Sequence, residues 1–346
     1  MSGRSTSIDV QGLLFIGDPH LEARIPGFRK DDYPHVALQK FRWCLQYARE
    51  HQLQPILLGD LFQLPQDNPN WLLSAIIESI DEPLPAIYGN HDVRENSLKP
   101  HDSIHILFAG GHLIQISSAS PWIGTVGGRQ TVVGGTAWGD KIPKEFVSDS
   151  IAADLVVWIT HHDILIPGYE DGGRIRPGEL SGIDLIVNGH IHRRLQPVSK
   201  GGTHWITAGN ITRRARSDAS REHIPAVPCL VPADDKCADD SSDVFLCKSQ
   251  TGESWQIRWV TVPHEPFDTV FYPEVESEEP DAEHGSGFIA DLRQLTARRT
   301  DSGAGLNEFL KQHLDQFEAP VANEIMRLAA EVTSDGPDNH NQNRDS

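Results

Sequence analysis

The stretch "DLIVNGHIHRR" at residues 184–194 joins an apolar run to two histidines. The run Leu185–Val187 is typical of a buried strand, and Gly189 leaves room for close backbone approach directly after it. His190 and His192 then follow at alternate positions, and alternate residues of extended backbone point the same way. The pattern predicts a buried strand that delivers two imidazoles to one edge of a sheet.

The same pattern occurs four more times, each time as a short apolar run followed by a glycine or small polar residue and a residue able to bind a metal. These segments are "GLLFIGDPH" (12–20), "PILLGDLF" (55–62), "PAIYGNHD" (85–92) and "LVVWITHHD" (155–163). Continuous apolar runs of this length suit strands that are buried on both faces. They predict a sheet that is sandwiched between other layers.

Helical patterns separate some of these runs. Apolar residues recur at helical spacing in 33–51, and in 67–82 Asp67 or Asn68 would cap a helix with Pro69 in its first turn. Alternating strands and helices predict an α/β fold. Later strands of more antiparallel character are expected at 203–211, 243–249, 254–262 and 268–273. A loop insertion is expected at 221–242, which is rich in Pro, Asp and Ala.

The charge of the chain is unevenly distributed. The formal net charge of −19 argues against a nucleic-acid partner. However, residues 273–284 carry six acids and no Lys or Arg, whereas residues 190–221 carry seven basic residues against the single Asp218. The net charge therefore does not decide the partner.

Cysteine usage and hydropathy bear on the compartment. Four cysteines in 346 residues do not make a disulfide framework, and their spacings, with His223 nearby, match no zinc-finger pattern. They are Cys44, Cys229, Cys237 and Cys247. No apolar run has the length of a signal peptide or a membrane span. We therefore expect a soluble, cytoplasmic protein without a membrane partner.

The ends of the five predicted strands supply a set of potential metal ligands. They are Asp18, His20, Asp60, Asn90, His91, His161, His162, His190 and His192. In layered α/β folds the carboxyl ends of strands converge on one edge, where ligands bind. Any one of these residues alone is more often a turn residue or a surface histidine. Five such segments in one chain favour a site for two divalent metals, since imidazole and carboxylate ligands suit Mn, Fe and Zn.

The ordered set "GDPH … GDLF … GNHD … THH … GHIH" over residues 12–192 resembles the calcineurin-like metallophosphoesterase superfamily. The resemblance implies a four-layer αββα sandwich with two metals bridged by one aspartate. The implied ligands are Asp18, His20, Asp60 and His192 for the first metal and Asp60, Asn90, His161 and His190 for the second. The expected metal is Mn²⁺, with Fe, Zn and Mg as alternatives.

The resemblance also implies catalytic roles. His91 would act as general acid or as a transition-state hydrogen-bond donor, with Asp92 beside it. In the pair His161-His162, the family pattern places the ligand at the first histidine. The chemistry implied is in-line attack of a water-derived nucleophile on phosphorus between two metals.

Finer features are similar to the SbcD-type (Mre-eleven-type) nuclease subunit of DNA double-strand-break repair. They are "GHIHRR", the following "THWITAGNITRRARSD" and "VTVPHEPFDTVFY" at 260–272. Two departures are Ala208-Gly209-Asn210, where that family has a PGS turn, and Gln63, where many relatives have a histidine. The residues predicted to bind the DNA backbone are Arg193, Arg194, Arg213 and Arg214. The alternatives are a small-nucleotide phosphodiesterase or phosphatase, and a non-catalytic scaffold.

The domain prediction places a catalytic domain at 1–272, an acidic linker at 273–286, helices at 287–333 and a disordered tail at 334–346. Within the helices, residues 305–332 carry an apolar face. This face either packs on the catalytic domain or docks on an SMC-like, SbcC-type ATPase, which is the partner that the resemblance implies beside DNA. A homodimer is a further expectation. The sequence leaves the metal and the cutting polarity open.

Overall fold

The computed structural model describes residues 8–147, 152–170, 172–233 and 244–273. The chain divides into two compact units, Met1–Tyr272 and Pro273–Ser346, and the fold described below is that of the first. The predicted linker, C-terminal helices and tail lie outside the described residues, as do Cys237 and most of the second half of the predicted insertion.

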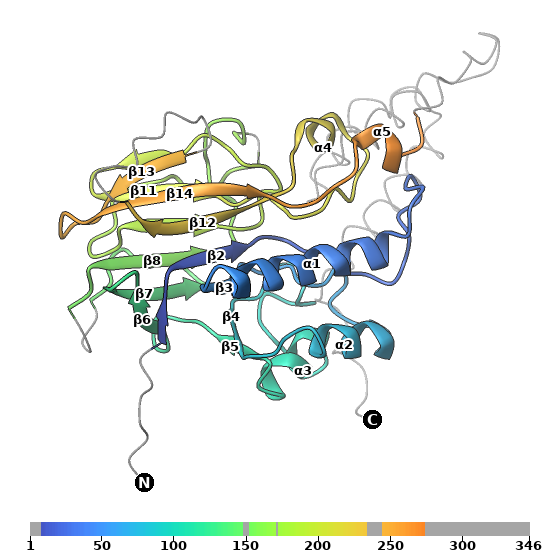
Figure 1. The fold of residues 1–346 in the computed structure, drawn as a ribbon, viewed down its shortest axis with the longest axis horizontal. Helices are drawn as coiled ribbons and strands as arrows, with labels where there is room; N and C mark the ends of the chain where they lie inside the picture. Colours follow the sequence, from blue (N-terminus) through green and yellow to red (C-terminus); the bar gives the residue numbers. More distant parts are fainter. Residues whose placement is uncertain (1–7, 148–151, 171, 234–243, 274–346) are drawn as a thin grey trace, which may run out of the picture. The chain divides into compact units, whose positions relative to one another are not determined.

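Two β-sheets form the centre of this unit (Figure 1). The first sheet has the strand order β1 (Ile8–Val10), β6 (Trp122–Val126), β7 (Arg129–Thr136), β8 (Leu155–Thr160), β9 (Leu185–Asn188), β11 (Thr203–Thr207) and β10 (Val198–Lys200). The second sheet has the order β13 (Val244–Lys248), β14 (Ser254–Thr261), β12 (Ala226–Pro232), β2 (Gly12–Ile16), β3 (Leu53–Leu57), β4 (Leu84–Ala86) and β5 (Leu113–Gln115). The strands that precede the polar motifs are parallel neighbours, β8 with β9 and β2 with β3.

The period-two alternation of the strands separates two hydrophobic cores. Val157 on β8 and Leu185 on β9 belong to the main core, which also contains Leu13 and Phe15 of the other sheet. The neighbouring Trp158, together with residues of β9 and β11, belongs to a second core on the opposite face. Both faces of β8 and β9 are thus buried, as their continuous apolar runs predict.

Helices cover the second sheet. Helix α1 (Tyr33–Glu50) packs on β2 and β3 and buries the face that includes Ala37, Phe41 and Cys44, which confirms the helix predicted at 33–51. Helix α2 (Asn70–Ile77) begins after Pro69, which occupies the cap position itself, and neither Asp67 nor Asn68 caps it. Helix α3 (Ser103–Ala109) packs beside β5.

The far face of the first sheet is covered differently. In the described residues its core is closed by irregular chain that contributes Ile142, Phe146, Ile164 and Ile166, and not by helices. The predicted α/β class with two packed sheets is confirmed. One outer layer is helical, and the other is made of loops.

Three local predictions are wrong. The strand β12 lies inside the segment 221–242, which is predicted to be a loop insertion partly because it is rich in proline. Pro228 is tolerated next to β2, because β12 pairs with β2 only at Cys229 and Leu230. Residues 268–273 do not form a strand, because helix α5 (Phe267–Val270) occupies them in part. The strand β11 is parallel to β9 and antiparallel only to β10.

Candidate metal centre

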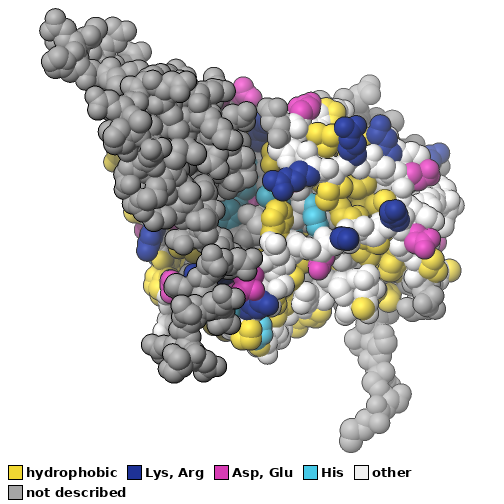
Figure 2. All heavy atoms as spheres, turned by 180° about the vertical axis from the view of Figure 1, so that it is seen from behind, with side chains coloured by type: hydrophobic (Ala, Val, Ile, Leu, Met, Phe, Trp, Pro, Cys, Tyr) yellow, Lys and Arg dark blue, Asp and Glu magenta, His cyan; other side chains and the backbone are white. Residues whose placement is uncertain are grey.

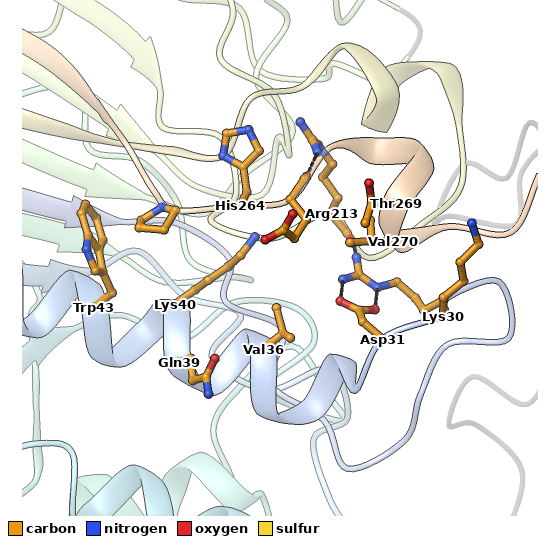
Figure 3. A pocket seen from close by; sticks show the side chains of 13 residues that line it. Lys30, Asp31, Val36, Gln39, Lys40, Trp43, Arg213, His264, Thr269 and Val270 are labelled. Atoms are coloured by element: carbon orange, nitrogen blue, oxygen red, sulfur yellow. Dashed lines mark hydrogen bonds and ion pairs between the residues drawn. The ribbon is translucent and has the colours of Figure 1, made fainter.

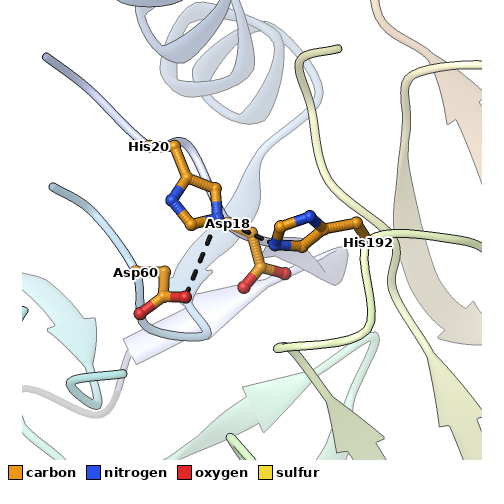
Figure 4. Close-up of side chains that lie close together, drawn as sticks. All are labelled: Asp18, His20, Asp60 and His192. Atoms are coloured by element: carbon orange, nitrogen blue, oxygen red, sulfur yellow. Dashed lines mark hydrogen bonds and ion pairs between the residues drawn. The ribbon is translucent and has the colours of Figure 1, made fainter. Parts of the chain in front are cut away.

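The structure gathers the strand-end residues into two overlapping groups. The first contains Asp18, His20, Asp60 and His192 (Figure 4). The second contains Asp60, His161 and His190. In each group the potential ligand atoms lie within 4.8 Å of one another. Asp60 belongs to both groups, which is the arrangement expected of a bridging carboxylate.

The ligands come from the carboxyl ends of strands in both sheets. Asp18 and His20 follow β2, and Asp60 follows β3, in the second sheet. His161 follows β8, and His190 follows β9, in the first sheet. Because the two sheets pack face to face, the edges at which these strands end meet, and segments more than one hundred residues apart share one site.

The backbone at this site is held in a rarely used conformation. Asp18, His20, Asp60 and His190 have positive φ angles of 44°, 44°, 50° and 65°. A non-glycine residue in this region costs roughly 1–3 kcal/mol, and such strain concentrates at functional sites. Four strained residues, all of them potential ligands, indicate that the surrounding structure holds these side chains in place.

Two glycines allow the strand ends to meet here. A Cβ atom at Gly89 would lie 2.1 Å from Asp60 Oδ1, and one at Gly189 would lie 2.7 Å from the Leu58 carbonyl oxygen. Both distances are too short for real side chains. The glycine that follows β9 therefore allows the close backbone approach that the sequence predicts.

The two carboxylates of the centre respond differently to burial. Both Asp18 and Asp60 are fully buried. Burial, together with the negative charge of Asp60, raises the pKa of Asp18 well above its usual range. Burial acts on Asp60 in the same direction, but His161, with further help from His20, holds the pKa of Asp60 well below its usual range. The two buried carboxylates belong to one group of potential ligand atoms that lie within 4.8 Å of one another, so their negative charges repel each other. Bound cations would relieve that repulsion.

The donor set fits divalent metals. Asp18 Oδ2 and His20 Nδ1 are buried and have no hydrogen-bond partner among the described residues, and the Nε2 atoms of His20 and His192 lie 2.9 Å apart. Burial and the adjacent His192 lower the pKa of His20 well below its usual value, so its imidazole is neutral and has a lone pair to donate. Buried carboxylate and neutral imidazole ligands are typical of Mn, Fe and Zn sites.

The two tandem histidines make different contacts. His161 Nδ1 lies 2.8 Å from the Leu58 carbonyl oxygen, which leaves Nε2 to face Asp60 Oδ2 at 3.1 Å. His162 Nε2 instead lies 2.8 Å from the carbonyl oxygen of Asp140. Of the pair, only His161 belongs to a potential metal group in the described part of the chain.

Asn90 and Asp163 extend the second group. Asn90 Oδ1 lies 3.1 Å from His161 Nε2 and 2.9 Å from His190 Nδ1, so the amide oxygen completes this group. The other ring nitrogen, His190 Nε2, lies 2.8 Å from Asp163 Oδ1. A carboxylate in this position fixes the tautomer and orientation of a ligand histidine. Sequence reasoning missed Asp163; its place directly after the histidine pair in "THHD" is the signal that could have indicated it.

His91 lies beside the metal groups but belongs to neither. Its ring is 4.8 Å from that of His20, centroid to centroid, and its backbone N–H donates to Asp60 Oδ1 at 2.8 Å. His91 Nδ1 lies 3.0 Å from the Gln63 carbonyl oxygen, and the Gln63 side chain lies 3.2 Å from the same nitrogen. Residue 63 therefore contacts the imidazole even though it is not a histidine.

Asp92 has a structural position. Its two carboxylate oxygens accept hydrogen bonds from the backbone N–H groups of Phe62 and Gly89, both at 2.9 Å, which ties the loop after β3 to the loop after β4. Burial, and then the charge of Asp60, raises the pKa of Asp92 to about 8. Asp92 is thus the neighbour of His91 in the chain, and its carboxylate stabilises the two loops that carry Asp60 and His91.

The four arginines predicted to bind DNA differ in exposure. Arg193 and Arg194 are half-buried, and the Arg194 guanidinium stacks on Trp259 at 4.1 Å. Arg214 forms an ion pair with Glu22 at 2.6 Å. Arg213 is buried, and its guanidinium donates to the carbonyl oxygens of His223 and Glu265. Arg213 is therefore not presented on the surface as a backbone contact would require.

The cysteines give no metal site in the described residues. Cys44, Cys229 and Cys247 are free and buried, and none of them joins a potential metal group. Burial raises the pKa of Cys229 to about 11 and of Cys247 to about 12.

Among the described helices, none has the length and apolar character needed to cross a bilayer.

Two overlapping carboxylate–imidazole groups at the edge of a two-sheet sandwich define the kind of centre that metal-dependent phosphoesterases use. Residues 13–194, or 182 of the 346 residues, match the family model of the calcineurin-like phosphoesterases. The chain belongs to this family. No curated protein matches it.

Three solved structures illustrate the weak similarity of this chain to known folds. A hypothetical protein from Thermus thermophilus is 13% identical, with a TM-score of 0.38 over 73% of this chain and 100% of that one. A predicted phosphoesterase from Streptococcus pneumoniae TIGR4 is 12% identical, with a TM-score of 0.31 over 77% and 94%. Vps29 complexed with zinc from Entamoeba histolytica is 13% identical, with a TM-score of 0.29 over 73% and 99%. At these scores the likeness carries no argument about function.

Proposed function

We propose that this protein is a two-metal phosphodiesterase that cleaves DNA. The observation that carries the hydrolytic part is the sharing of Asp60 by two groups of potential ligands. Asp18, His20, Asp60 and His192 would hold one cation, and Asp60, Asn90, His161 and His190 the other. When bound, two divalent cations would neutralise the phosphate and activate a water molecule for attack on phosphorus.

The side chains of the centre prepare it for that chemistry. The strained backbone holds the ligands in place before substrate arrives, which lowers the reorganisation required during reaction. His91 Nδ1 is engaged by Gln63, while Nε2 has no hydrogen-bond partner among the described residues. Because the Gln63 carbonyl oxygen can only accept, Nδ1 carries a proton, and Nε2 carries one as well only in the imidazolium form. We assign the imidazolium form of His91 to donate a proton or hydrogen bond from Nε2 to the phosphate or its leaving oxygen.

The proposal of a DNA substrate rests on the resemblance of residues 189–194, 203–218 and 260–272 to SbcD-type nucleases and on the arginines near the centre. Arg193 and Arg194 directly follow the ligand His192, and Arg214 is close enough to His20 to contribute to lowering its pKa. Phosphate oxygens of DNA are contacted mainly by such side chains. A Mn²⁺-dependent nuclease of double-strand-break repair or recombination is the finer form of this proposal.

A coiled-coil ATPase is the proposed partner. The sequence of residues 305–332 predicts a helix with an apolar face, and each large side chain on it would contribute roughly 1.5–3 kcal/mol if fully covered. Truncation after Tyr272 should leave a metal-loaded enzyme that cleaves a small diester but no longer associates with the ATPase. An insoluble or metal-free truncated chain would instead mean that these helices complete the catalytic domain.

A phosphodiesterase acting on a small nucleotide is the second candidate. The burial of Arg213 and the pairing of Arg214 with Glu22 favour it, because both reduce the positive charge available to a DNA backbone. On the described part of the face drawn in Figure 2, Lys and Arg side chains lie scattered among hydrophobic and uncharged residues and form no continuous basic surface. A small substrate would need fewer cations than a duplex does.

The two candidates are separated by comparing substrates. Purified protein in Mn²⁺ should hydrolyse bis-p-nitrophenyl phosphate and degrade linear duplex DNA, and Arg193→Ala with Arg194→Ala should reduce only the second activity. The exposed Arg49, which pairs with Asp81, offers a matched control as Arg49→Ala. Diester hydrolysis without DNA cleavage would support the small-nucleotide candidate. Loss of neither activity on metal removal would contradict both.

A further inference from the structure

A cavity of about 520 Å³ lies between helix α1 and the segment that leads into α5 (Figure 3). Its wall includes Arg29, Lys40 and Trp43 from the first side and Arg213, Pro263 and Val270 from the second. None of its lining residues belongs to either metal group. The volume falls in the range of sites that hold small organic ligands.

Lys40 is the central observation. It is buried, with 9% of its surface exposed, and its ammonium forms no hydrogen bond or ion pair with any described residue. Figure 3 shows its side chain extending from α1 into the cavity. Lys40 Nζ is not among the fully buried, unpartnered atoms of the described residues, so the ammonium faces the open cavity, where an anionic ligand can pair with it. The wall therefore presents three ammonium N–H donors that the described residues leave unused.

The surrounding charges reinforce this preference for an anion. Arg29 is neutralised by two hydrogen bonds to Asp31 and stacks between the rings of Tyr33 and Phe271. The two guanidinium bonds of Arg213 to backbone carbonyls leave its charge uncompensated. The lining contains four cations, Arg29, Lys30, Lys40 and Arg213, and two acids, Asp31 and Glu265, which gives a net charge of +2.

The other part of the wall is apolar. Trp43 is half-buried on α1, and Pro263 and Val270 line the cavity from the other segment. An indole ring accepts a flat ring by stacking, and a Lys–Arg pair accepts the doubly negative phosphate group of a monoester. Charge at one part of the cavity and aromatic surface at another match a ligand that has both features.

We propose that this cavity binds a phosphate monoester that carries a planar ring, of nucleoside-monophosphate size. The phosphate receives hydrogen bonds from Lys40 and Arg213, and the ring packs against Trp43. This site is separate from the metal centre and does not depend on the proposed hydrolytic function.

The test is calorimetric binding of AMP to the full-length, metal-loaded protein. Lys40→Met should weaken AMP binding at least tenfold, because it removes the ammonium donors while keeping a side chain of similar length. Lys99→Met is the matched control, because Lys99 pairs with Glu95 on another segment and lines no part of the cavity. Inorganic phosphate should bind more weakly than AMP, and adenosine should not bind. Hydrolysis of bis-p-nitrophenyl phosphate by Lys40→Met should equal that of the wild type.

One further variant makes the outcome decisive. Asp18→Asn removes a proposed ligand of the metal centre and should leave AMP binding intact, so loss of binding in this variant would place AMP at the metals and overturn the proposal. Equal AMP affinity in Lys40→Met and the wild type would also overturn it.

Discussion

The metal centre and the α1 cavity collect opposite charges by different structural means. The metal centre is built from strand ends, where four potential ligands with positive φ present carboxylates and imidazoles to one another. The cavity is built from the side of a helix, and Lys40 there lies in regular α1 backbone. Strand ends from two sheets can converge on one point, whereas a helix face offers a surface. The converging strand ends thus match the small cations proposed for the metal centre, and the helix face matches the extended anion proposed for the cavity.

The largest effect is expected from Asp60→Ala. Because Asp60 is the one residue shared by both groups, its removal should cause loss of both metals and lower diester hydrolysis by more than roughly a thousandfold. Metal analysis of the purified variant, with hydrolysis of bis-p-nitrophenyl phosphate, measures this. Asp81→Ala, an exposed acid paired with Arg49, is the control. Retention of two metals per chain would refute the bridging role.

His91→Ala should separate chemistry from metal binding. The imidazole lies beside the centre without belonging to a metal group, so hydrolysis should fall roughly 100- to 10,000-fold with metal content near normal. The exposed His101 provides the control His101→Ala. If the His91 variant loses its metals, His91 is a ligand and not a donor.

Asp163→Asn should have a smaller effect on the metal centre. Hydrogen bonding to His190 lowers the pKa of Asp163 against the effect of burial, and removing this negative charge weakens the orientation and basicity of the imidazole. We expect metal affinity to fall about 10- to 100-fold, measured by metal titration. Glu170→Gln, a nearby exposed acid, should not change it. Unchanged affinity in Asp163→Asn would show that His190 needs no such partner.

Replacing Lys40 should change the free energy of unfolding of the protein and leave its hydrolytic activity unchanged. Burial, with Arg29 and Arg213 adding to it, lowers the pKa of Lys40 from 10.5 to about 8. Between pH 8 and 10.5 the unfolded chain binds a proton at Lys40 that the folded chain does not, so stability rises with pH across this window. Lys40→Met should therefore be more stable than the wild type at pH 7 by about 3 kcal/mol, and equal to it above pH 10.5. Thermal or denaturant unfolding at both pH values tests this, and a destabilised variant at pH 7 would contradict it.

The sequence by itself determined the parts of the protein in which function follows directly from local pattern. Apolar runs ending at Gly-Asp, Gly-Asn or Gly-His predict the buried strands and the polar residues at their ends, because residues that directly follow a buried strand lie at the edge of its sheet. On this basis Asp18, Asp60 and His190 are expected at one edge, and the structure brings them together there. The helix α1 follows from its periodic apolar face.

Only the tertiary structure decided which neighbours meet across the sheets. The pairing of Asp163 with His190 and the separate contacts of His161 and His162 depend on loop conformations that no local pattern specifies. Arg213 is buried, and its N–H donors are taken up by the carbonyl oxygens of His223 and Glu265, which no local pattern predicts. The burial of Lys40 likewise requires a segment more than two hundred residues away. Local propensity acts over a few residues, whereas burial and partnership are properties of the packed chain.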